Sequence, residues 1–256
     1  MKSATADEVI ERVLAEHRGG SAVIAFDADG TLWSGDAGED LFGHATRARL
    51  LRQPAHAELE RLAAGAGLPT DGGANELGQR LFDAYVGGRF AEHTVCELMA
   101  WGFAGYAPAE LGELCREVLD QTRMAERYHP SLLKILAATR AAGVRAVVVS
   151  ASPRCIVEAA ARPLGFAPED VAAATPAIEG GELLPRLSEP LPYGAAKCDA
   201  LRRLAADASW LASFGDNVFD LDMLCAARCG VVVRPKPRLR ARLPELPELI
   251  LLADDP

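Results

Sequence analysis

Two aspartates and a glycine directly after an apolar run are the residues of this sequence that most clearly suggest chemistry. The run begins at Ala22 and is typical of a fully buried strand, and it ends at Asp27, Ala28, Asp29 and Gly30. The glycine allows the chain to turn there. Acids crowded at the end of a buried strand repel each other unless a cation or a proton neutralises them. The pattern therefore predicts a divalent metal bound by oxygen ligands, although the same acids could simply cap the following segment.

Three further features fall where other strands are expected to end. Ser150 and Ala151 close a second apolar run and precede a helix start, so a hydroxyl and free helix N–H groups predict an anion site, or a plain N-cap. Lys197 lies at a loop-to-helix transition, where most lysines are solvated. Asp216 and Asp220 follow a third apolar run and a glycine. Because ligands of parallel sheets bind beyond the carboxyl ends of the strands, we expect these groups to meet.

The elements that must position these residues alternate between strands and helices. A capping box of Thr5 and Glu8 predicts a first helix before the strand that begins at Ala22. Later strands are expected at 144–150, 171–174, 210–214 and 230–233, with helices at 131–142, 153–162, 195–206 and 218–227 and a polar hairpin around 179–182. This rhythm predicts an α/β fold with a Rossmann-like, mostly parallel sheet covered by helices on both faces.

A helical segment interrupts that rhythm between the first and second motifs. Expected helices, separated by glycine and proline, lie at 40–52, 55–65, 75–86, 91–103 and 108–126. We therefore predict two domains, a catalytic core of residues 1–35 and 128–256 and an all-α cap of residues 36–127.

Composition excludes several classes of function. The chain has 256 residues, is 50% hydrophobic and carries a formal net charge of −9, which supports a globular core and argues against a nucleic-acid-binding surface. No apolar run is long enough for a leader or a membrane span, so we expect a cytoplasmic protein without a membrane partner. The six cysteines contain no Cys-x-x-Cys pair. One basic cluster is interpreted as a solvated helix start: Arg234, Lys236, Arg238, Arg240 and Arg242.

With its four features in order, the sequence resembles the haloacid dehalogenase superfamily of aspartate-based phosphotransferases. The resemblance rests on Asp27-Ala28-Asp29-Gly30-Thr31, Ser150, Lys197, and Gly215-Asp216 followed by Asp220. The helical insertion is similar to the cap of the phosphoserine-phosphatase-like branch, as are Val149-Ser150-Ala151-Ser152-Pro153 and Arg234-Pro235-Lys236-Pro237.

This resemblance implies a role for each motif residue. Asp27 would be the nucleophile that forms an aspartyl-phosphate, and Asp29 the general acid and base. Mg²⁺ would be the cofactor, held by Asp27, the Asp29 carbonyl and Asp216, with Asp220 supporting the site. The phosphoryl oxygens would be bound by Ser150, Ala151, Lys197 and Gly30. A carboxylate can attack a phosphate dianion only when metal and ammonium cancel the repulsion, which agrees with these roles.

The implied function is a Mg²⁺-dependent phosphomonoester hydrolase, similar to phosphoserine phosphatase, acting on a small phosphorylated metabolite. Alternatives are a phosphatase of the phosphocholine or phosphoethanolamine type, a phosphomutase, and a non-enzymatic phosphate-binding regulator. The last is disfavoured because no catalytic acid is missing. A monomer or homodimer is expected.

The sequence does not decide which residues contact the substrate. Asp36 and Glu39 lie where the phosphoserine phosphatases place an acid that meets the substrate, and Arg80 and Arg89 are candidates for a substrate carboxylate. Phe219 stands where many relatives have Asn, which removes a polar contact. Aromatic faces for an ammonium group are expected from Trp33, Tyr85, Phe90, Trp101 and Phe103, unless these pack in the cap core.

Overall fold

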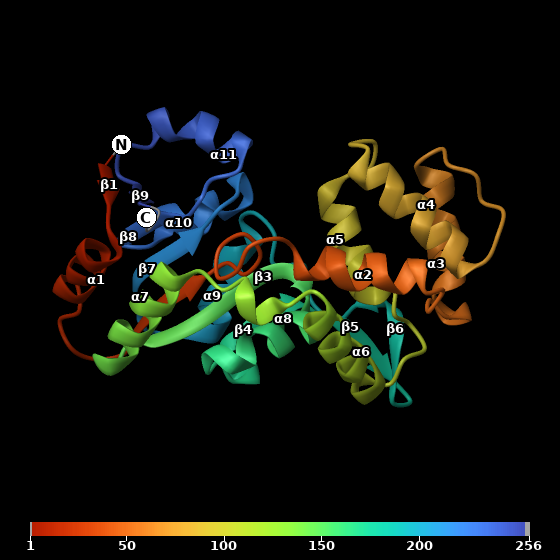
Figure 1. Ribbon diagram of the computed structural model, residues 1–256, viewed down its shortest axis with the longest axis horizontal. Helices are drawn as coiled ribbons and strands as arrows, with labels where there is room; N and C mark the ends of the chain where they lie inside the picture. The colour runs from red at the N-terminus through yellow and green to blue at the C-terminus, as the bar shows by residue number, and fades with distance from the viewer. Residues whose placement is uncertain (1, 254–256) are drawn as a thin grey trace.

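The computed structural model describes residues 2–253 and is built around one parallel sheet (Figure 1). Its seven strands lie in the order β1, β9, β8, β7, β2, β3, β4, and every neighbouring pair is parallel. The strands are β1 (Lys2–Ala4), β2 (Ala22–Phe26), β3 (Arg145–Pro153), β4 (Val171–Ala174), β7 (Ser209–Gly215), β8 (Cys229–Val232) and β9 (Ile250–Leu252). The predicted α/β class with a parallel sheet is confirmed.

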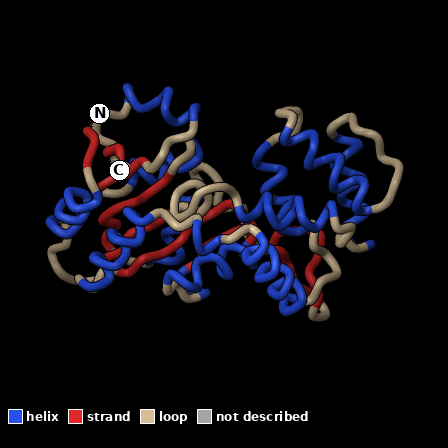
Figure 2. The backbone as a smooth tube through the Cα atoms, viewed as in Figure 1, coloured by secondary structure: helices blue, strands red, loops and turns tan. Residues whose placement is uncertain are grey.

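Helices cover both faces of this sheet, as the tube in Figure 2 also shows. One face packs against α1 (Ala6–Ala15), α7 (Pro130–Ala141) and α8 (Arg154–Ala161), and the other against α9 (Ala196–Ala205) and α10 (Leu221–Ala226). Next to α10, α11 (Pro237–Arg242) packs against β8 and β9. Short 3-10 helices complete the chain: η1 (Gln53–Ala55), η2 (Met124–Glu126), η3 (Arg162–Leu164), η4 (Pro168–Asp170), η5 (Val218–Asp220) and η6 (Leu243–Glu245).

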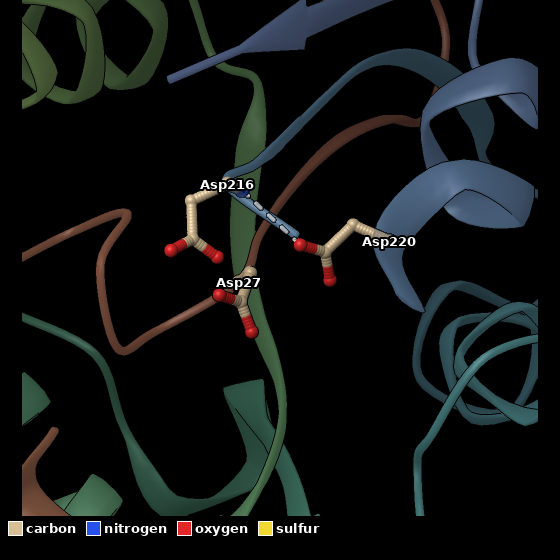
Figure 3. A group of neighbouring side chains, drawn as sticks. All are labelled: Asp27, Asp216 and Asp220. Atoms are coloured by element: carbon tan, nitrogen blue, oxygen red, sulfur yellow. Dashed lines mark hydrogen bonds between the residues drawn. The ribbon is translucent and has the colours of Figure 1, made fainter. Parts of the chain in front are cut away.

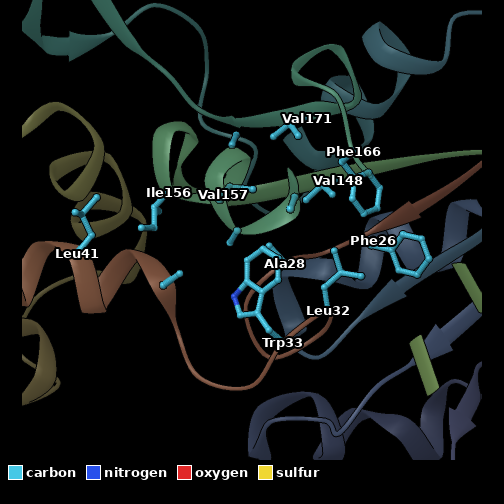
Figure 4. Packing of buried hydrophobic residues seen from close by; sticks show 14 of the residues in the cluster. Phe26, Ala28, Leu32, Trp33, Leu41, Val148, Ile156, Val157, Phe166 and Val171 are labelled. Carbon is cyan, nitrogen blue, oxygen red and sulfur yellow. The ribbon is translucent and has the colours of Figure 1, made fainter. Parts of the chain in front are cut away.

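The central strand β2 is buried on both sides, which explains its uninterrupted apolar sequence. Val23 and Ala25 belong to the core below α9, whereas Ile24 and Phe26 belong to the core below α1 and α7. The Phe26 ring stacks on Phe214 of β7 with centroids 4.5 Å apart. Figure 4 shows Phe26 and the residues that continue this core beyond the end of the strand. Packing on both faces therefore explains why all five residues of β2 are apolar.

The residues between the first two motifs form a second lobe, drawn in yellow and orange on the right of Figure 1. Its helices are α2 (Ala37–Arg47), α3 (His56–Gly65), α4 (Ala74–Val86), α5 (Glu92–Trp101) and α6 (Pro108–Gln121). All five begin and end within five residues of the predicted ranges.

A later hairpin also belongs to this lobe. It consists of β5 (Pro176–Glu179) and β6 (Glu182–Leu187), which pair antiparallel. The Leu183 N–H donates to the Tyr106 carbonyl and the Gly105 N–H donates to the Leu183 carbonyl, both at 2.9 Å. The second lobe is therefore built from the insertion together with a segment that follows β4, which sequence spacing alone had placed with the core.

Two ends of the chain differ from the sequence-based expectation. The strands β1 and β9, which pair with each other at the sheet edge, were not predicted, because three residues carry too little pattern to indicate a strand.

The predicted capping box before α1 is present, since the Thr5 N–H donates to Glu8 at 2.8 Å and the Glu8 N–H donates back to Thr5 at 3.3 Å. Among residues 2–253, none of the helices combines the length and apolar character needed to cross a bilayer.

Candidate active site

Adjacent strands bring the predicted acids to one end of the sheet. Asp27 follows β2, Asp216 follows β7, and Ser150 lies in β3, on the other side of β2. Figure 3 shows Asp27, Asp216 and Asp220 approaching one another from separate segments. One carboxylate oxygen of each of the three lies within 4.8 Å of the other two, and all three residues are buried. Such a set of hard oxygen donors suits a divalent cation.

The chain turns tightly after β2 and thereby aims Asp27 and Asp29 into this space. The N–H of Leu32 donates to the Ala28 carbonyl at 2.8 Å, and Gly30 adopts a φ of +80° while its N–H donates to the Trp33 carbonyl at 2.8 Å. A Cβ at Gly30 would lie 2.0 Å from Asp216 Oδ2. Glycine is therefore required here both for the backbone angle and for the approach of Asp216.

Lys197 at the start of α9 joins the acids of different loops. Its Nζ donates to Asp27 Oδ1 at 2.7 Å and to Asp220 Oδ1 at 2.5 Å, and its side chain is only 4% exposed. Burial opposes the charge of this ammonium, but the carboxylates of Asp220 and Asp27 outweigh burial and raise the pKa of Lys197. The site thus contains a permanent buried cation beside Asp27.

Asp216 shows the strongest sign that the site binds a cation. Burial, followed by the charge of Asp27, raises the pKa of Asp216 to about 8. Its Oδ1 is buried and has no hydrogen-bond partner among the described residues. Asp220 holds the loop in place, because its Oδ2 accepts the N–H groups of Asp216 at 3.1 Å and Asn217 at 2.9 Å. An orphaned carboxylate oxygen beside two other acids fits the Mg²⁺ expected from the sequence.

Lys236 corrects the interpretation of the basic cluster as a solvated helix start. Its Nζ lies 3.3 Å from Asp216 Oδ2, and its N–H donates to the Asp216 carbonyl at 2.8 Å. All five members of the cluster are exposed, as expected, so the correction concerns only Lys236, whose ammonium group reaches Asp216. Sequence spacing could not indicate this contact, because it depends on how the loop after β8 folds back.

Asp29 is held by three donors from different segments. Its Oδ1 accepts the Trp33 indole N–H and the Ala37 N–H, both at 2.7 Å, and its Oδ2 accepts the Ser152 hydroxyl at 2.6 Å. Burial raises the pKa of Asp29, although these hydrogen bonds act against it. A rigid, buried carboxyl group with a raised pKa is suited to hold and deliver a proton. Sequence reasoning missed Ser152, whose only signal was its position two residues after Ser150.

These groups surround a cavity of about 60 Å³ between the two lobes. Besides the acids and Lys197, the phosphate candidates Ser150 and Ala151 line it. From the insertion come Asp36, Glu92 and Cys96. The remaining lining residues are Ser152, Tyr193, Asn217, Phe219 and Lys236. Larger hollows of 740 Å³ and 230 Å³ lie beside α6 and α8, and no predicted site residue lines either.

The structure brings only one of the four substrate candidates to this cavity. Asp36 lines it, and it also caps α2 by accepting the Glu39 N–H at 2.8 Å. Burial, and then the charges of Asp29 and Glu39, raises the pKa of Asp36 well above its usual range. Glu39 does not line the cavity and accepts the Tyr85 hydroxyl at 2.8 Å.

The two candidate arginines lie elsewhere. Arg80 donates to the carbonyls of Pro69 at 2.7 Å and Asp71 at 2.9 Å, within the loop between α3 and α4. Arg89 is exposed in the loop after α4. Neither side chain lines the cavity, so the structure does not place a guanidinium where a substrate carboxylate was expected.

The aromatic side chains at the cavity also differ from those expected. Tyr193 and Phe219 line it, with ring centroids 4.2 Å apart. The five aromatic residues proposed from the sequence do not line the cavity. Trp33, for example, is fully buried and donates a hydrogen bond to Asp29 instead. The replacement of the usual Asn by Phe219 therefore substitutes an aromatic surface for a polar contact.

Comparison with known proteins agrees with this geometry. Residues 24–224 match a family model described as haloacid dehalogenase-like hydrolase. A phosphoserine phosphatase of Streptomyces coelicolor is 31% identical over 173 residues, which is 62% of this chain and 41% of that protein. The chain thus spans less than half the length of this curated relative.

Solved structures share the fold at low sequence identity. A protein of unknown function from Bordetella pertussis Tohama I has a TM-score of 0.72 at 18% identity, covering 92% of this chain and 100% of that one. A functionally unknown protein from Anaerococcus prevotii has a TM-score of 0.68 at 14% identity, covering 96% and 90%. A substrate-bound phosphoserine phosphatase has a TM-score of 0.56 at 14% identity, covering 93% and 96%.

Proposed function

The chain belongs to the haloacid dehalogenase-like hydrolase family, and from this premise we propose that it is a Mg²⁺-dependent phosphomonoesterase that acts on a small phosphorylated metabolite. The observation that carries the proposal is the contact between the buried Lys197 ammonium and Asp27, beside the orphaned oxygen of Asp216. A nucleophilic carboxylate needs such cations, because it must approach a phosphate dianion.

In the proposed first step, a carboxylate oxygen of Asp27 attacks phosphorus, and the bond from phosphorus to the ester oxygen breaks. The departing alkoxide takes a proton from Asp29. In the second step Asp29 removes a proton from water, whose oxygen attacks the aspartyl-phosphate, so that inorganic phosphate leaves and Asp27 is restored. The hydrogen bonds from Trp33, Ala37 and Ser152 hold Asp29 in place for both transfers.

The remaining residues of the site bind the metal ion or the phosphoryl group and do not transfer protons. Mg²⁺ would be held by Asp27, Asp216 and the Asp29 carbonyl, with Asp220 supporting the site. When bound, it would neutralise negative charge on the phosphoryl oxygens. Lys197 would bind a phosphoryl oxygen together with the Ser150 hydroxyl and the backbone at Ala151. Phosphoryl transfer depends mainly on this kind of positioning and electrostatic stabilisation.

The insertion limits the size of the substrate in this proposal. Residues 36–127, together with the β5–β6 hairpin, act as a cap on a core formed by residues 1–35 and the rest of 128–256, and Asp36 and Glu92 of this cap line the cavity together with the core motifs. We expect a cap that closes over the site to exclude bulk water and to favour a small substrate over a phosphoprotein. A small phosphomonoester and a cytoplasmic location are parts of the same proposal.

The proposal is tested by hydrolysis of p-nitrophenyl phosphate near neutral pH. We expect activity with Mg²⁺, none after EDTA treatment, and none in Asp27→Asn, because an amide is a poor nucleophile and a weak metal ligand. Asp7→Asn is the matched control, since Asp7 is an exposed aspartate on α1 whose ion pair with Lys134 of α7 lies outside the cavity. Full activity with EDTA, or in Asp27→Asn, would show that another group performs the reaction.

A further inference from the structure

Four residues that the motifs do not include form one wall of the cavity: Asp36, Glu92, Tyr193 and Phe219. We propose that this acidic-aromatic wall binds the ammonium group of the substrate, so that the substrate class is an aminoalkyl phosphate that has no carboxylate. This inference rests on the proposed phosphatase activity and names the substrate class of the same site.

The four residues are neighbours in space. Glu92 and Cys96 are one turn apart on α5 and both line the cavity. The charge of Glu92 adds to burial in raising the pKa of the Tyr193 hydroxyl, and the charges of Asp36 and Glu92 add to burial in raising the pKa of the Cys96 thiol. All four residues line the same cavity, and the rings of Tyr193 and Phe219 are in contact.

More carboxylates than ammonium groups line the cavity, which favours the binding of a cation. Six carboxylates line it against two ammonium groups. Both ammonium groups already have partners, because Lys197 contacts Asp27 and Asp220, and Lys236 contacts Asp216. A Mg²⁺ ion would be offset by the phosphate dianion that it binds. Within the described part of the chain, the two acids of the wall are therefore left without an ammonium group in contact, which agrees with the raised pKa of both carboxyls.

Among the described residues, neither acid of the wall has a cation within hydrogen-bonding distance, although the charge of Lys236 acts to lower the pKa of both against the larger effect of burial. Within residues 2–253, the one hydrogen bond that Asp36 accepts comes from the N–H of Glu39 at the start of α2. The ion-pair partner of Glu92 is Arg238, whose guanidinium is 4.0 Å away and whose side chain is 74% exposed. A half-buried carboxylate without a close cation is unfavourable, and an ammonium group arriving between these acids would relieve it.

The aromatic pair adds a second attraction for a cation. Tyr193 and Phe219 pack with centroids 4.2 Å apart and present ring surface to the cavity. A cation within about 6 Å of such a ring is stabilised by its quadrupole. The guanidinium carbon of Arg238 lies 5.8 Å from the Phe219 centroid, so this ring already has a cation within that range on the outside.

A substrate carboxylate has no comparable partner. Among the described residues no arginine lines the cavity, and the candidates Arg80 and Arg89 lie elsewhere. The carboxylate of phosphoserine would have to lie beside Asp36 and Glu92, where like charges repel. The wall therefore selects against phosphoserine and in favour of the same amine without the carboxylate.

The test compares kcat/KM for three substrates of similar size with the Mg²⁺-loaded enzyme. Phosphoethanolamine should exceed 2-hydroxyethyl phosphate, its neutral counterpart, and phosphoserine by about tenfold or more each, the scale of one contact with a charged group. In Glu92→Gln and in Phe219→Asn the ratio for phosphoethanolamine over 2-hydroxyethyl phosphate should fall towards one. Glu97→Gln, on the same helix but outside the cavity lining, should leave the ratio unchanged.

The outcomes separate this inference from the proposed function. If p-nitrophenyl phosphate is hydrolysed through Asp27 but phosphoethanolamine shows no advantage, the inference is wrong and the proposed function stands. A preference for phosphoserine would likewise overturn it and would point to Arg238, the ion-pair partner of Glu92, as the group that binds the carboxylate. If no ester is hydrolysed, calorimetric binding to Asp27→Asn decides: tighter binding of phosphoethanolamine than of 2-hydroxyethyl phosphate supports the wall, and equal or no binding refutes it.

Discussion

Replacing Lys197 by Met removes the buried ammonium while keeping most of the side-chain volume. The Nζ contacts Asp27 at 2.7 Å and Asp220 at 2.5 Å, so its loss leaves Asp27, Asp216 and Asp220 buried together without this cation. Removing one partner of a buried ion pair costs about 3–5 kcal/mol. At about 2–4 °C per kcal/mol for a domain of this size, Lys197→Met should unfold roughly 6–20 °C below the wild type without metal.

Thermal unfolding with and without Mg²⁺ measures this effect. The deficit should shrink when Mg²⁺ is added, because a bound divalent cation supplies charge to the same carboxylates and stabilises the folded state that binds it. Turnover should fall on the order of a hundredfold or more, the scale of one lost preorganised charge. Lys134→Met is the control, since the Lys134 ion pair with Asp7 is exposed and should contribute under about 1 kcal/mol.

The reasoning is refuted if Lys197→Met unfolds within about 3 °C of the wild type at every Mg²⁺ concentration and also turns over within about threefold of it. That pair of results would mean that the contacts of Lys197 with Asp27 and Asp220 contribute neither to stability nor to catalysis.

Three other substitutions test separate parts of the site. Gly30→Ala places a Cβ 2.0 Å from Asp216 Oδ2 at a φ of +80°, so calorimetry should find Mg²⁺ binding weakened about tenfold or more; unchanged binding would contradict the packing described. Ser152→Ala removes the donor to Asp29 at 2.6 Å and should lower kcat/KM by about 10–100-fold for alkyl phosphates and less for aryl phosphates; equal losses would argue against a positioning role. Arg80→Ala should leave KM within about twofold in steady-state assays, because Arg80 binds loop carbonyls; a large rise would place Arg80 at the substrate.

Much of the arrangement could be predicted because it depends on local pattern and on the topology of parallel sheets. The apolar run of β2 and the acids after it fix one strand end, and the same logic gives the ends that carry Ser150 and Asp216. Strands that are parallel and adjacent must bring these ends together. Lys197 could be placed only through the family resemblance, since a lysine at a helix start is usually solvated.

The residues that were missed depend on contacts between distant segments. Ser152 and Trp33 donate hydrogen bonds to Asp29 because the loop after β2 lies against β3. The periodicity of the sequence does not indicate this packing. The Tyr193 and Phe219 pair brings together two loops on either side of α9. Aromatic residues at helical spacing suggested the cap instead, where the structure shows that Phe103 and Trp101 are buried core.

The central claim is that Asp27 carries the phosphoryl group and that Asp29 moves protons, and pre-steady-state hydrolysis by Asp29→Asn tests it most directly. An activated aryl phosphate scarcely needs a protonated leaving oxygen, whereas hydrolysis of the aspartyl-phosphate still needs a base. Rapid-quench measurement with Mg²⁺ should therefore show a burst of phenol of about one equivalent per enzyme, followed by slow turnover, and alkyl phosphates should be far more impaired. Equal losses for both ester types, with no burst and no phosphorylated Asp27, would contradict the account.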